Sequence, residues 1–438
     1  MKDSFESLFT VEAIKHEYSI LCQRKFDYLK SVPNIQSGHD GIDYHAFEAN
    51  QEQRIRTISR KVISTDKAEC RYTFSPFLEH EIPKPDSTST RTISIGTISD
   101  TLVQQAISRH LEPHVEKLLP HQVYAYRKGK SARQAARHVY KSVASGNRFV
   151  FEADIVKFFD KINRSILIDM MESLPIDVRA KTLIRRFLHS KRVLHEHVKS
   201  KTTTAKYQST FREAGVPQGG VLSGMLSNLY LSKLDAVLGS FPGYARYADD
   251  FLVCCSTREE AKLAESLAQA TLECLRLQLH PDKSFITDVA ETKPIKFLGF
   301  SICPSEIRIH PKNIEKFKAS ICEVINSQIF FENADSNIRR LLRRLRYKVC
   351  GPESDELRNT YSGLNNPLLY RRCWIGYFRC ATDLQQIKHL DKFILARVSY
   401  FAYSRYGIRL NRRQIREWGL PSLVSTYYKS RRGIPVQT

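Results

Sequence analysis

Two adjacent acidic residues, Asp249 and Asp250, interrupt a stretch that otherwise has the composition of buried strands. Apolar runs lie on both sides of them, at residues 243–246 and 251–255. This pattern predicts two strands joined by a tight turn that carries the carboxylates. Carboxylates beside a core are costly unless they are paired, and Mg²⁺ prefers carboxylate and phosphate oxygens. The alternative is a solvated hairpin turn, because Asp is a common turn residue.

A third acidic residue, Asp154, ends another strand-like segment at residues 149–154. Phosphoryl transfer by two metal ions uses carboxylates from separate strands, which hold the ions about 3.5–4 Å apart. One ion activates a 3′-hydroxyl group and the other stabilises the leaving pyrophosphate. Asp154, Asp249 and Asp250 are therefore the candidate carboxylates of such a site.

A glycine-rich segment, residues 215–223, lies between these two acidic regions and leads into a predicted helix. Gln218 and Gly219 lie in its middle. Glycines let a backbone approach a base or a sugar closely, and the free N–H groups at a helix start can bind phosphate. The segment is a candidate nucleotide platform, and the alternative is a simple turn.

The charge balance favours a polyanionic partner. The chain has 68 Lys and Arg residues against 46 Asp and Glu residues, a net charge of +22, which is typical of nucleic-acid-binding proteins. Hydrophobic residues make up 42% of the chain, which excludes a disordered or fibrous protein. The sequence contains no apolar run of about 18 residues, no secretory signal and no Cys-x-x-Cys pair. We therefore expect a cytoplasmic protein with no membrane partner.

The order of elements predicts an α+β fold. Helical patterns dominate residues 1–80, and helix and strand patterns alternate over residues 148–300. Within that region residues 179–194 are basic and predict a helix, whereas residues 296–303 predict one short strand. From about residue 310 the chain is helical and basic.

The motifs together resemble a known family. Their order along the chain is Asp154, Pro217-Gln218-Gly219, Tyr247-Ala248-Asp249-Asp250, Lys283 and Phe297-Leu298-Gly299-Phe300. This order resembles the successive palm motifs of reverse transcriptases. Residues 126–132 resemble a stretch of group II intron enzymes, and residues 374–379 and 390–393 resemble the thumb and maturase region of those enzymes.

The resemblance implies a right-hand polymerase fold with an antiparallel palm sheet. Residues 1–80 would form an N-terminal helical extension and residues 81–147 the fingers. Residues 148–309 would form the palm with interleaved fingers segments. Residues 310–438 would form a helical, basic thumb and C-terminal region.

The resemblance also implies roles at the catalytic centre. Asp154 and Asp249 would bind two Mg²⁺ ions, for which Mn²⁺ is an alternative, together with the backbone carbonyl of Ile155. Asp250 would be a further ligand or a support. Lys283 would protonate the leaving pyrophosphate, and a solvated turn lysine is the alternative.

Further residues would bind the incoming nucleotide. Phe159 would act as a steric gate against the 2′-hydroxyl and so favour dNTPs. Gln218 and Gly219 would contact the nucleotide and the template. Lys84 and Arg91 would grip the triphosphate, because guanidinium groups suit phosphate oxygens.

A cluster of arginines marks the C-terminal third. The four that we expect to bind nucleic acid are Arg339, Arg340, Arg343 and Arg344. Their spacings of three and four place several on one helix face. No acid lies between Arg339 and Lys348. Such a face suits a phosphate backbone, and simple solubility is the alternative.

The resemblance implies an RNA-directed DNA polymerase that acts on an RNA template with a DNA or RNA primer and dNTPs. No endonuclease or ribonuclease H pattern is present in the sequence, which resembles stand-alone defence-associated enzymes that use a structured noncoding RNA against phage. The alternatives are an endonuclease-lacking group II intron maturase and a CRISPR-associated reverse transcriptase. Whether the chain forms a homo-oligomer or binds a partner protein stays open.

Overall fold

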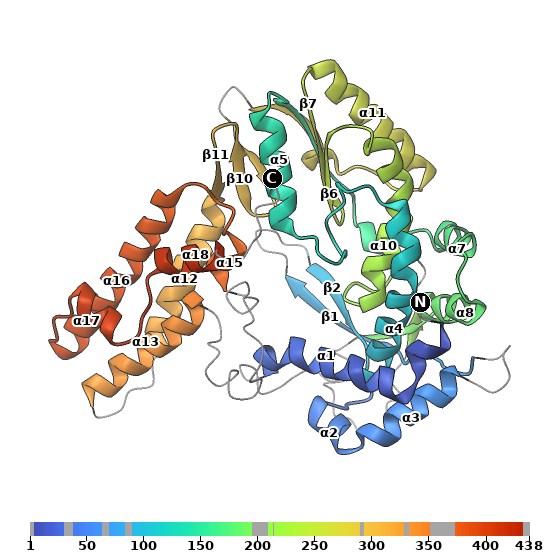
Figure 1. Ribbon diagram of the computed structural model, residues 1–438, viewed down its shortest axis with the longest axis horizontal. Helices are drawn as coiled ribbons and strands as arrows, with labels where there is room; N and C mark the ends of the chain where they lie inside the picture. The colour runs from blue at the N-terminus through green and yellow to red at the C-terminus, as the bar shows by residue number, and fades with distance from the viewer. Residues whose placement is uncertain are drawn as a thin grey trace. The chain divides into compact units, whose positions relative to one another are not determined.

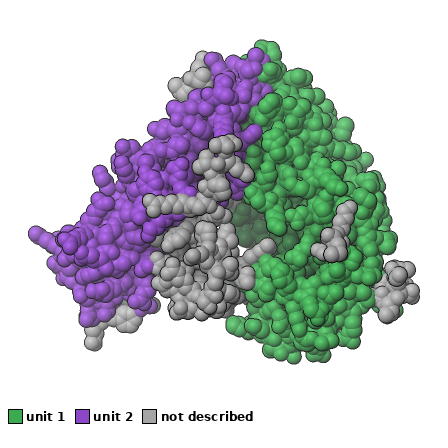
Figure 2. All heavy atoms as spheres, in the orientation of Figure 1, with its two compact units in different colours: residues 1–130, 151–253, 258–286 green, residues 131–150, 254–257, 287–438 purple. Residues whose placement is uncertain are grey.

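The computed structural model describes residues 4–29, 38–63, 70–83, 90–194, 209–212, 214–289, 293–327, 333–350 and 373–431 of the 438-residue chain (Figure 1). The chain divides into two compact units, which Figure 2 shows in different colours. Unit 1 contains residues 1–130, 151–253 and 258–286, and unit 2 contains residues 131–150, 254–257 and 287–438.

Unit 1 begins with short helices that pack on one another. They are η1 (Glu6–Phe9), α1 (Val11–Leu29), α2 (Tyr44–Ala49) and α3 (Gln51–Val62). The Asp43 side chain caps α2 by accepting a hydrogen bond from the N–H of Ala46, as is usual at a helix start. Apolar residues at helical spacing bury one face of α3.

A four-stranded sheet follows, with the order β2-β1-β4-β5 among the described residues. Its strands are β1 (Phe77–Pro83), β2 (Thr90–Ile95), β4 (Lys191–Leu194) and β5 (Thr210–Phe211). β1 pairs antiparallel with β2 and parallel with β4. The helix predicted over residues 179–194 is therefore too long. It ends at Leu188, because the next residues pair with β1 from a distant part of the sequence.

Helices surround the centre of unit 1. They are α4 (Ile98–Val115), η2 (Glu116–Leu118), α6 (Phe158–Lys161), α7 (Arg164–Glu172), α8 (Val178–Leu188), α10 (Val221–Leu238) and α11 (Arg258–Cys274). α10 is buried on nearly all sides, which explains its continuous apolar sequence. It packs against α4, α7 and α11, and Figure 1 shows α4 beside it.

A second four-stranded sheet carries the acidic residues. Its order among the described residues is β6-β7-β3-β8, with β3 (Phe149–Asp154), β6 (Gly243–Tyr247), β7 (Asp250–Cys255) and β8 (Phe285–Asp288). β6 and β7 are the two strands that the sequence predicts around a tight turn. β3 is the immediate neighbour of β7, so two segments that are about 100 residues apart in sequence lie side by side.

Unit 2 combines helices with a small sheet of order β11-β10-β9 among the described residues. Its elements are α5 (Ala132–Ala144), β9 (Ile295–Phe297), β10 (Phe300–Cys303), β11 (Glu306–Ile309), α12 (Pro311–Asn326), α13 (Ala334–Cys350), α15 (Trp374–Tyr377), α16 (Leu384–Tyr406), α17 (Arg412–Glu417) and α18 (Leu423–Arg431).

The single strand predicted over residues 296–303 is wrong, because the chain turns at Leu298 and Gly299, both at positive φ. The core of unit 2 includes a stacked pair, Phe317 and Trp374, whose ring centroids lie 4.0 Å apart. None of the helices in the described ranges is long and apolar enough to cross a membrane.

Candidate active site

The three candidate carboxylates lie at adjacent strand ends. Asp154 is the last residue of β3, and Asp250 is the first residue of the neighbouring strand β7. Asp249 lies in the turn just before β7. The structure therefore brings together the three acidic residues that the sequence singled out.

The segment after β3 is fixed by residues 278–280. The N–H of His280 donates to the carbonyl of Asp154 at 2.8 Å, and the N–H of Val156 donates to the carbonyl of Gln278 at 3.0 Å. In such an antiparallel bridge the residue between these two bonds turns its own carbonyl to the other side. The Ile155 carbonyl therefore points away from residues 278–280.

The same segment delivers a lysine to the carboxylates. The N–H of Lys283 donates to the carbonyl of His280, and its Nζ lies 2.5 Å from Oδ2 of Asp154. The Lys283 side chain is 59% exposed, whereas that of Asp154 is 21% exposed. A positive charge thus reaches the carboxylates from the solvent side.

Burial and neighbouring negative charge disfavour the ionised forms of Asp249 and Asp250. Burial raises the pKa of Asp249, and the negative charge of Asp154 raises it further, whereas Lys283 opposes this effect. Burial also raises the pKa of Asp250 well above its ordinary value, assisted by the charges of Asp154, Asp249 and Glu152. This arrangement calls for a cation.

The donor set suits a hard divalent ion, since carboxylate and carbonyl oxygens are the ligands that Mg²⁺ prefers. Among the described residues, no three His, Cys, Asp or Glu side chains are grouped closely enough to hold a metal ion. The fit to Mg²⁺ therefore rests on the oxygen donors and on the excess negative charge at Asp249 and Asp250.

Two neighbouring phenylalanines, Phe158 and Phe159, differ in burial. Phe158 is buried, as expected for a core residue, whereas Phe159 is half-buried on α6. Their ring centroids lie 5.2 Å apart in a T-shaped contact. The carbonyl of Phe159 accepts a hydrogen bond from the N–H of Val216 at 2.8 Å, which ties α6 to the glycine-rich segment.

The glycine-rich segment is held between α6 and β2. Gly215 and Gly219 have positive φ values of 74° and 110°. A Cβ atom on Gly215 would collide with the carbonyl of Phe159, and one on Gly219 would lie 2.8 Å from the carbonyl of Ser94. On the other side, the N–H of Ser94 donates to the carbonyl of Gln218 at 2.7 Å. Glycine is required at both positions by conformation and by close approach.

A buried charge network supports this attachment, and no sequence motif indicates it. The Ser94 hydroxyl donates to Glu79 at 3.2 Å, and Arg212 donates to the Ser94 hydroxyl at 2.8 Å and also pairs with Glu79. The Glu79 side chain is fully buried. Burial lowers the pKa of Arg212 to about 10.

Of the two residues predicted to bind the triphosphate, Lys84 and Arg91, the structure describes one. Lys84 lies outside the described residues. Arg91 is exposed on β2, opposite Ile82 of β1 and three residues before Ser94. Arg91 therefore belongs to the strand that holds Gln218 and Gly219.

Tyr126 is a site residue that the motif analysis missed. Its φ is 57° and its side chain is about half exposed. The ring covers Gly224, where a Cβ atom would lie 2.6 Å from it. Burial raises the pKa of Tyr126, and the charge of Asp249 adds to this effect. The sequence signal for this contact is Gly224, because only a residue without a Cβ atom permits the close approach of the ring.

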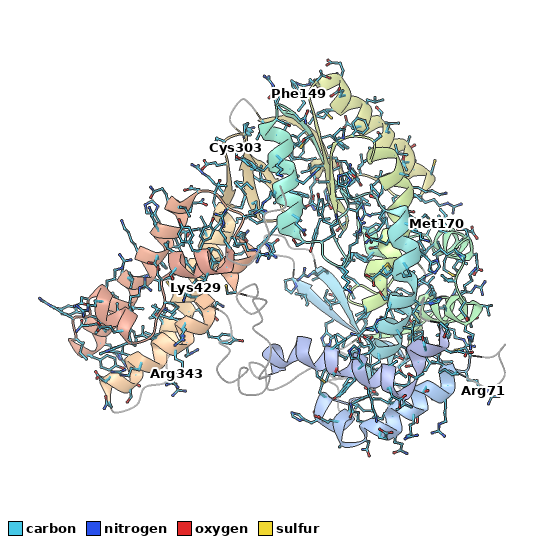
Figure 3. All side chains as sticks on the ribbon, viewed as in Figure 1. Arg71, Phe149, Met170, Cys303, Arg343 and Lys429 are labelled. Carbon is cyan, nitrogen blue, oxygen red and sulfur yellow. The ribbon has the colours of Figure 1, made fainter. Side chains whose placement is uncertain are left out.

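The arginine cluster lies on α13 in unit 2. One face of this helix buries Ile338, Leu341, Leu342 and Leu345. Arg339 lies over the Trp418 ring at 4.7 Å, and Arg344 donates to Ser327 at 3.1 Å and 3.2 Å. Arg340 is partly exposed, and Arg343, labelled in Figure 3, is exposed. Arg339, Arg340 and Arg344 thus all have interactions within the protein.

Comparison with known proteins identifies the family. A model of the reverse transcriptase (RNA-dependent DNA polymerase) family matches residues 82–302, half of the chain. The chain belongs to the reverse transcriptase family. This confirms the resemblance that the sequence motifs indicated, and the α+β fold agrees with it.

Several of its curated relatives are intron-encoded proteins. The chain is 30% identical over 154 residues to the Group II intron-encoded protein LtrA of Lactococcus lactis subsp. cremoris, covering 35% of this chain and 24% of that protein. It is 20% identical over 426 residues to the Putative COX1/OXI3 intron 1 protein of Saccharomyces cerevisiae, covering 82% and 49%. The chain thus spans less than half the length of these relatives.

A solved telomerase structure from Candida albicans, in complex with a fragment of telomeric RNA, is also similar. It has 12% sequence identity and a TM-score of 0.41, and the match covers 88% of this chain and 66% of that chain.

The contact between Gly219 and Ser94 predicts a stability effect. Gly219→Ala is expected to lower the free energy of unfolding by about 1 kcal/mol through backbone strain and by about 1–3 kcal/mol more through the collision with the Ser94 carbonyl. Gly146→Ala is the matched control, because its φ is 104° and no atom lies within 4 Å of the added Cβ. Urea unfolding measures both variants, and equal losses would contradict the attachment of the loop to β2.

Proposed function

We propose that the chain is an RNA-directed DNA polymerase that extends a primer on an RNA template. The observation that carries this proposal is the meeting of Asp154, Asp249 and Asp250 at the ends of β3 and β7, beside Lys283. Binding of RNA alone needs no group of mutually repelling carboxylates. Membership of the reverse transcriptase family supports the same conclusion.

The carboxylates would hold the metal ions. Asp154, Asp249 and the Ile155 carbonyl are the proposed ligands for two Mg²⁺ ions, which Mn²⁺ could replace, and Asp250 is a ligand or a support. When bound, such ions favour ionisation of the primer hydroxyl and offset the charge of the leaving pyrophosphate. Lys283 is placed to give a proton to the pyrophosphate, and its contact with Asp154 favours this role over that of a solvated turn lysine.

The nucleotide would bind beside the glycine-rich segment. Phe159 and Gln218 are connected through Val216 and the backbone of the segment, which supports a shared role of the two residues at the nucleotide. Gly219 would contact the nucleotide and the template. Lys84 and Arg91 would bind its triphosphate. In this proposal residues 81–147 act as fingers, residues 148–309 as the palm and residues 310–438 as the thumb.

The biological role depends on which RNA serves as the template. A dedicated noncoding RNA in antiphage defence is the first candidate, and a CRISPR-associated enzyme is an alternative. The names of the curated relatives favour another role, an intron maturase and reverse transcriptase. Sequencing of the RNA that copurifies with the chain distinguishes these roles, because an intron, a CRISPR transcript and a dedicated noncoding RNA differ in genomic origin.

Removal of two carboxylates tests the activity. Asp249→Asn with Asp250→Asn is expected to reduce primer extension by at least about 10³-fold, because the charge that stabilises the transition state is lost. RNA affinity is expected to stay within about twofold, since phosphate contacts dominate that affinity. Asp169→Asn, an exposed carboxylate on α7, is the control. Full extension by the double variant would refute the proposal.

A second variant tests sugar choice. Phe159→Ala should open space beside C2′ and reduce the preference for dNTPs over rNTPs by roughly 10–100-fold, the range that steric pocket contacts provide. Single-nucleotide incorporation with matched dNTP and rNTP pairs measures the ratio. An unchanged ratio would show that Phe159 is only a packing residue.

The arginines of α13 are tested by salt dependence. Replacing Arg340, Arg343 and Arg344 with Gln should make the slope of log affinity against log salt shallower by roughly two to three, at about 0.7–0.9 per lost phosphate contact. Filter binding of the RNA–primer duplex at several salt concentrations gives the slope.

The control for this experiment removes the same charge elsewhere. Arg60, Lys61 and Lys262 are basic residues of unit 1, and their replacement with Gln should leave the slope nearly unchanged. Equal slopes for the two triple variants would show that α13 has no special role in binding.

A further inference from the structure

A fully buried arginine, Arg246, lies two residues before the turn that carries Asp249. The Arg246 side chain and that of its partner Asp235 both have zero exposure. Nε and Nη2 of Arg246 donate to the two carboxylate oxygens of Asp235 at 2.7 Å and 2.5 Å. This is the bidentate geometry in which a guanidinium and a carboxylate bind most strongly.

The remaining nitrogen of the guanidinium reaches the turn itself. Nη1 of Arg246 donates to the carbonyl of Ala248 at 2.9 Å. That carbonyl belongs to the peptide group that joins Ala248 to Asp249. The orientation of this peptide group sets the direction in which the Asp249 side chain leaves the backbone.

The backbone at this point needs such support. Ala248 has a φ of 60°, in the left-handed region that is unfavourable for a residue with a Cβ atom. A strained conformation persists only where surrounding contacts determine it. The hydrogen bond from Arg246 acts directly on the Ala248 carbonyl.

The arginine is held from two further directions. Its N–H donates to the carbonyl of Gln122 at 3.1 Å, and its carbonyl accepts from the N–H of Tyr124 at 2.9 Å. The Tyr244 hydroxyl donates to Asp235 at 2.7 Å, which fixes the carboxylate. The guanidinium therefore has one defined position relative to the turn.

The partner Asp235 connects this turn to the nucleotide loop. Asp235 lies on α10, whose first residue follows Gly220 directly. Fifteen residues separate Gly220 from Asp235, which corresponds to about 22 Å along a helix at 1.5 Å per residue. One rigid helix thus spans from the loop of Gln218 and Gly219 to the ion pair that supports the carboxylates.

Stability alone does not explain this arrangement. A buried ion pair that is replaced by apolar residues of similar volume often leaves stability unchanged or increased. An apolar replacement, however, has no donor for the Ala248 carbonyl. We propose that Asp235 and Arg246 form a positioning clamp, which fixes the Ala248–Asp249 peptide group and so aligns the carboxylates for metal ions. The proposal rests on the function proposed above.

The experiment replaces the clamp without leaving a buried charge. The triple variant Asp235→Leu, Tyr244→Phe and Arg246→Met removes the three polar groups together. Its melting temperature and its RNA affinity are expected to match those of the wild type. Its extension rate should fall about 10²-fold, as expected for misplacement of a reacting group by about 1 Å. Its affinity for Mn²⁺, measured by electron paramagnetic resonance, should fall about 10–100-fold, the usual effect of losing a group that orients metal ligands.

The control is a second arginine in an ion pair of unit 1. The Arg179 side chain is 11% exposed and pairs with Asp177 and Glu6. Arg179→Met is expected to lower the melting temperature and to leave both the extension rate per folded molecule and the Mn²⁺ affinity unchanged. A purely structural role of Arg246 would give the same pattern as this control.

The outcomes separate the clamp from the proposed function. Wild-type Mn²⁺ affinity and extension rate in the folded triple variant would overturn the clamp. If the wild type itself fails to extend primers, the proposed function is wrong, and the Mn²⁺ affinities still decide the clamp. If the triple variant does not fold, Arg246→Lys decides it, because the lysine keeps the buried charge but lacks the fork that reaches both partners. That variant should bind Mn²⁺ about tenfold more weakly, and unchanged affinity would refute the proposal.

Discussion

Repulsion among carboxylates is the constraint on which the rest of the site depends. Asp154, Asp249 and Asp250 lie at the ends of two neighbouring strands, and the charge of Asp154 raises the energy of the charged forms of Asp249 and Asp250. Such a group does not form by hydrophobic packing, so the fold must hold it by other means. The pairing of β3 with β7 supplies the positions, and a cation is needed to make the charges compatible.

The glycine-rich segment, where we propose that the nucleotide binds, is also held by contacts other than hydrophobic packing. The glycine-rich segment has no regular structure of its own, yet backbone hydrogen bonds attach it to β2 through Ser94 and to α6 through Phe159. Positive φ at Gly215 and Gly219 permits these close approaches. The loop is therefore held by the elements around it, as the proposed contact with a nucleotide would require.

The sequence predicted the parts of the site that lie in continuous motifs. Asp154, Asp249 and Asp250 stand out because charges interrupt apolar runs, and the structure places them at adjacent strand ends. The network of Glu79 with Arg212 was not predictable, because Glu79 lies on β1 and Arg212 follows β5, 133 residues later in the sequence. β4 was missed for the same reason, since its parallel pairing with β1 overrides a local helical pattern. Local sequence patterns predict local structure, whereas the pairing of segments that are distant in sequence is known only from the structure.

The contact between Lys283 and Asp154 offsets part of the negative charge of the carboxylates, and a metal ion could replace it at little cost in stability. The ammonium group partly neutralises the carboxylates, which accounts for the opposing effect of Lys283 on the pKa values of Asp249 and Asp250. Because the Lys283 side chain is more than half exposed, its ion pair is worth only about 0–1 kcal/mol. A divalent cation held by the carboxylates would therefore compete with it easily. Lys283 would then be free to reach the pyrophosphate of the proposed reaction, while the buried pair of Asp235 and Arg246 would keep its contacts.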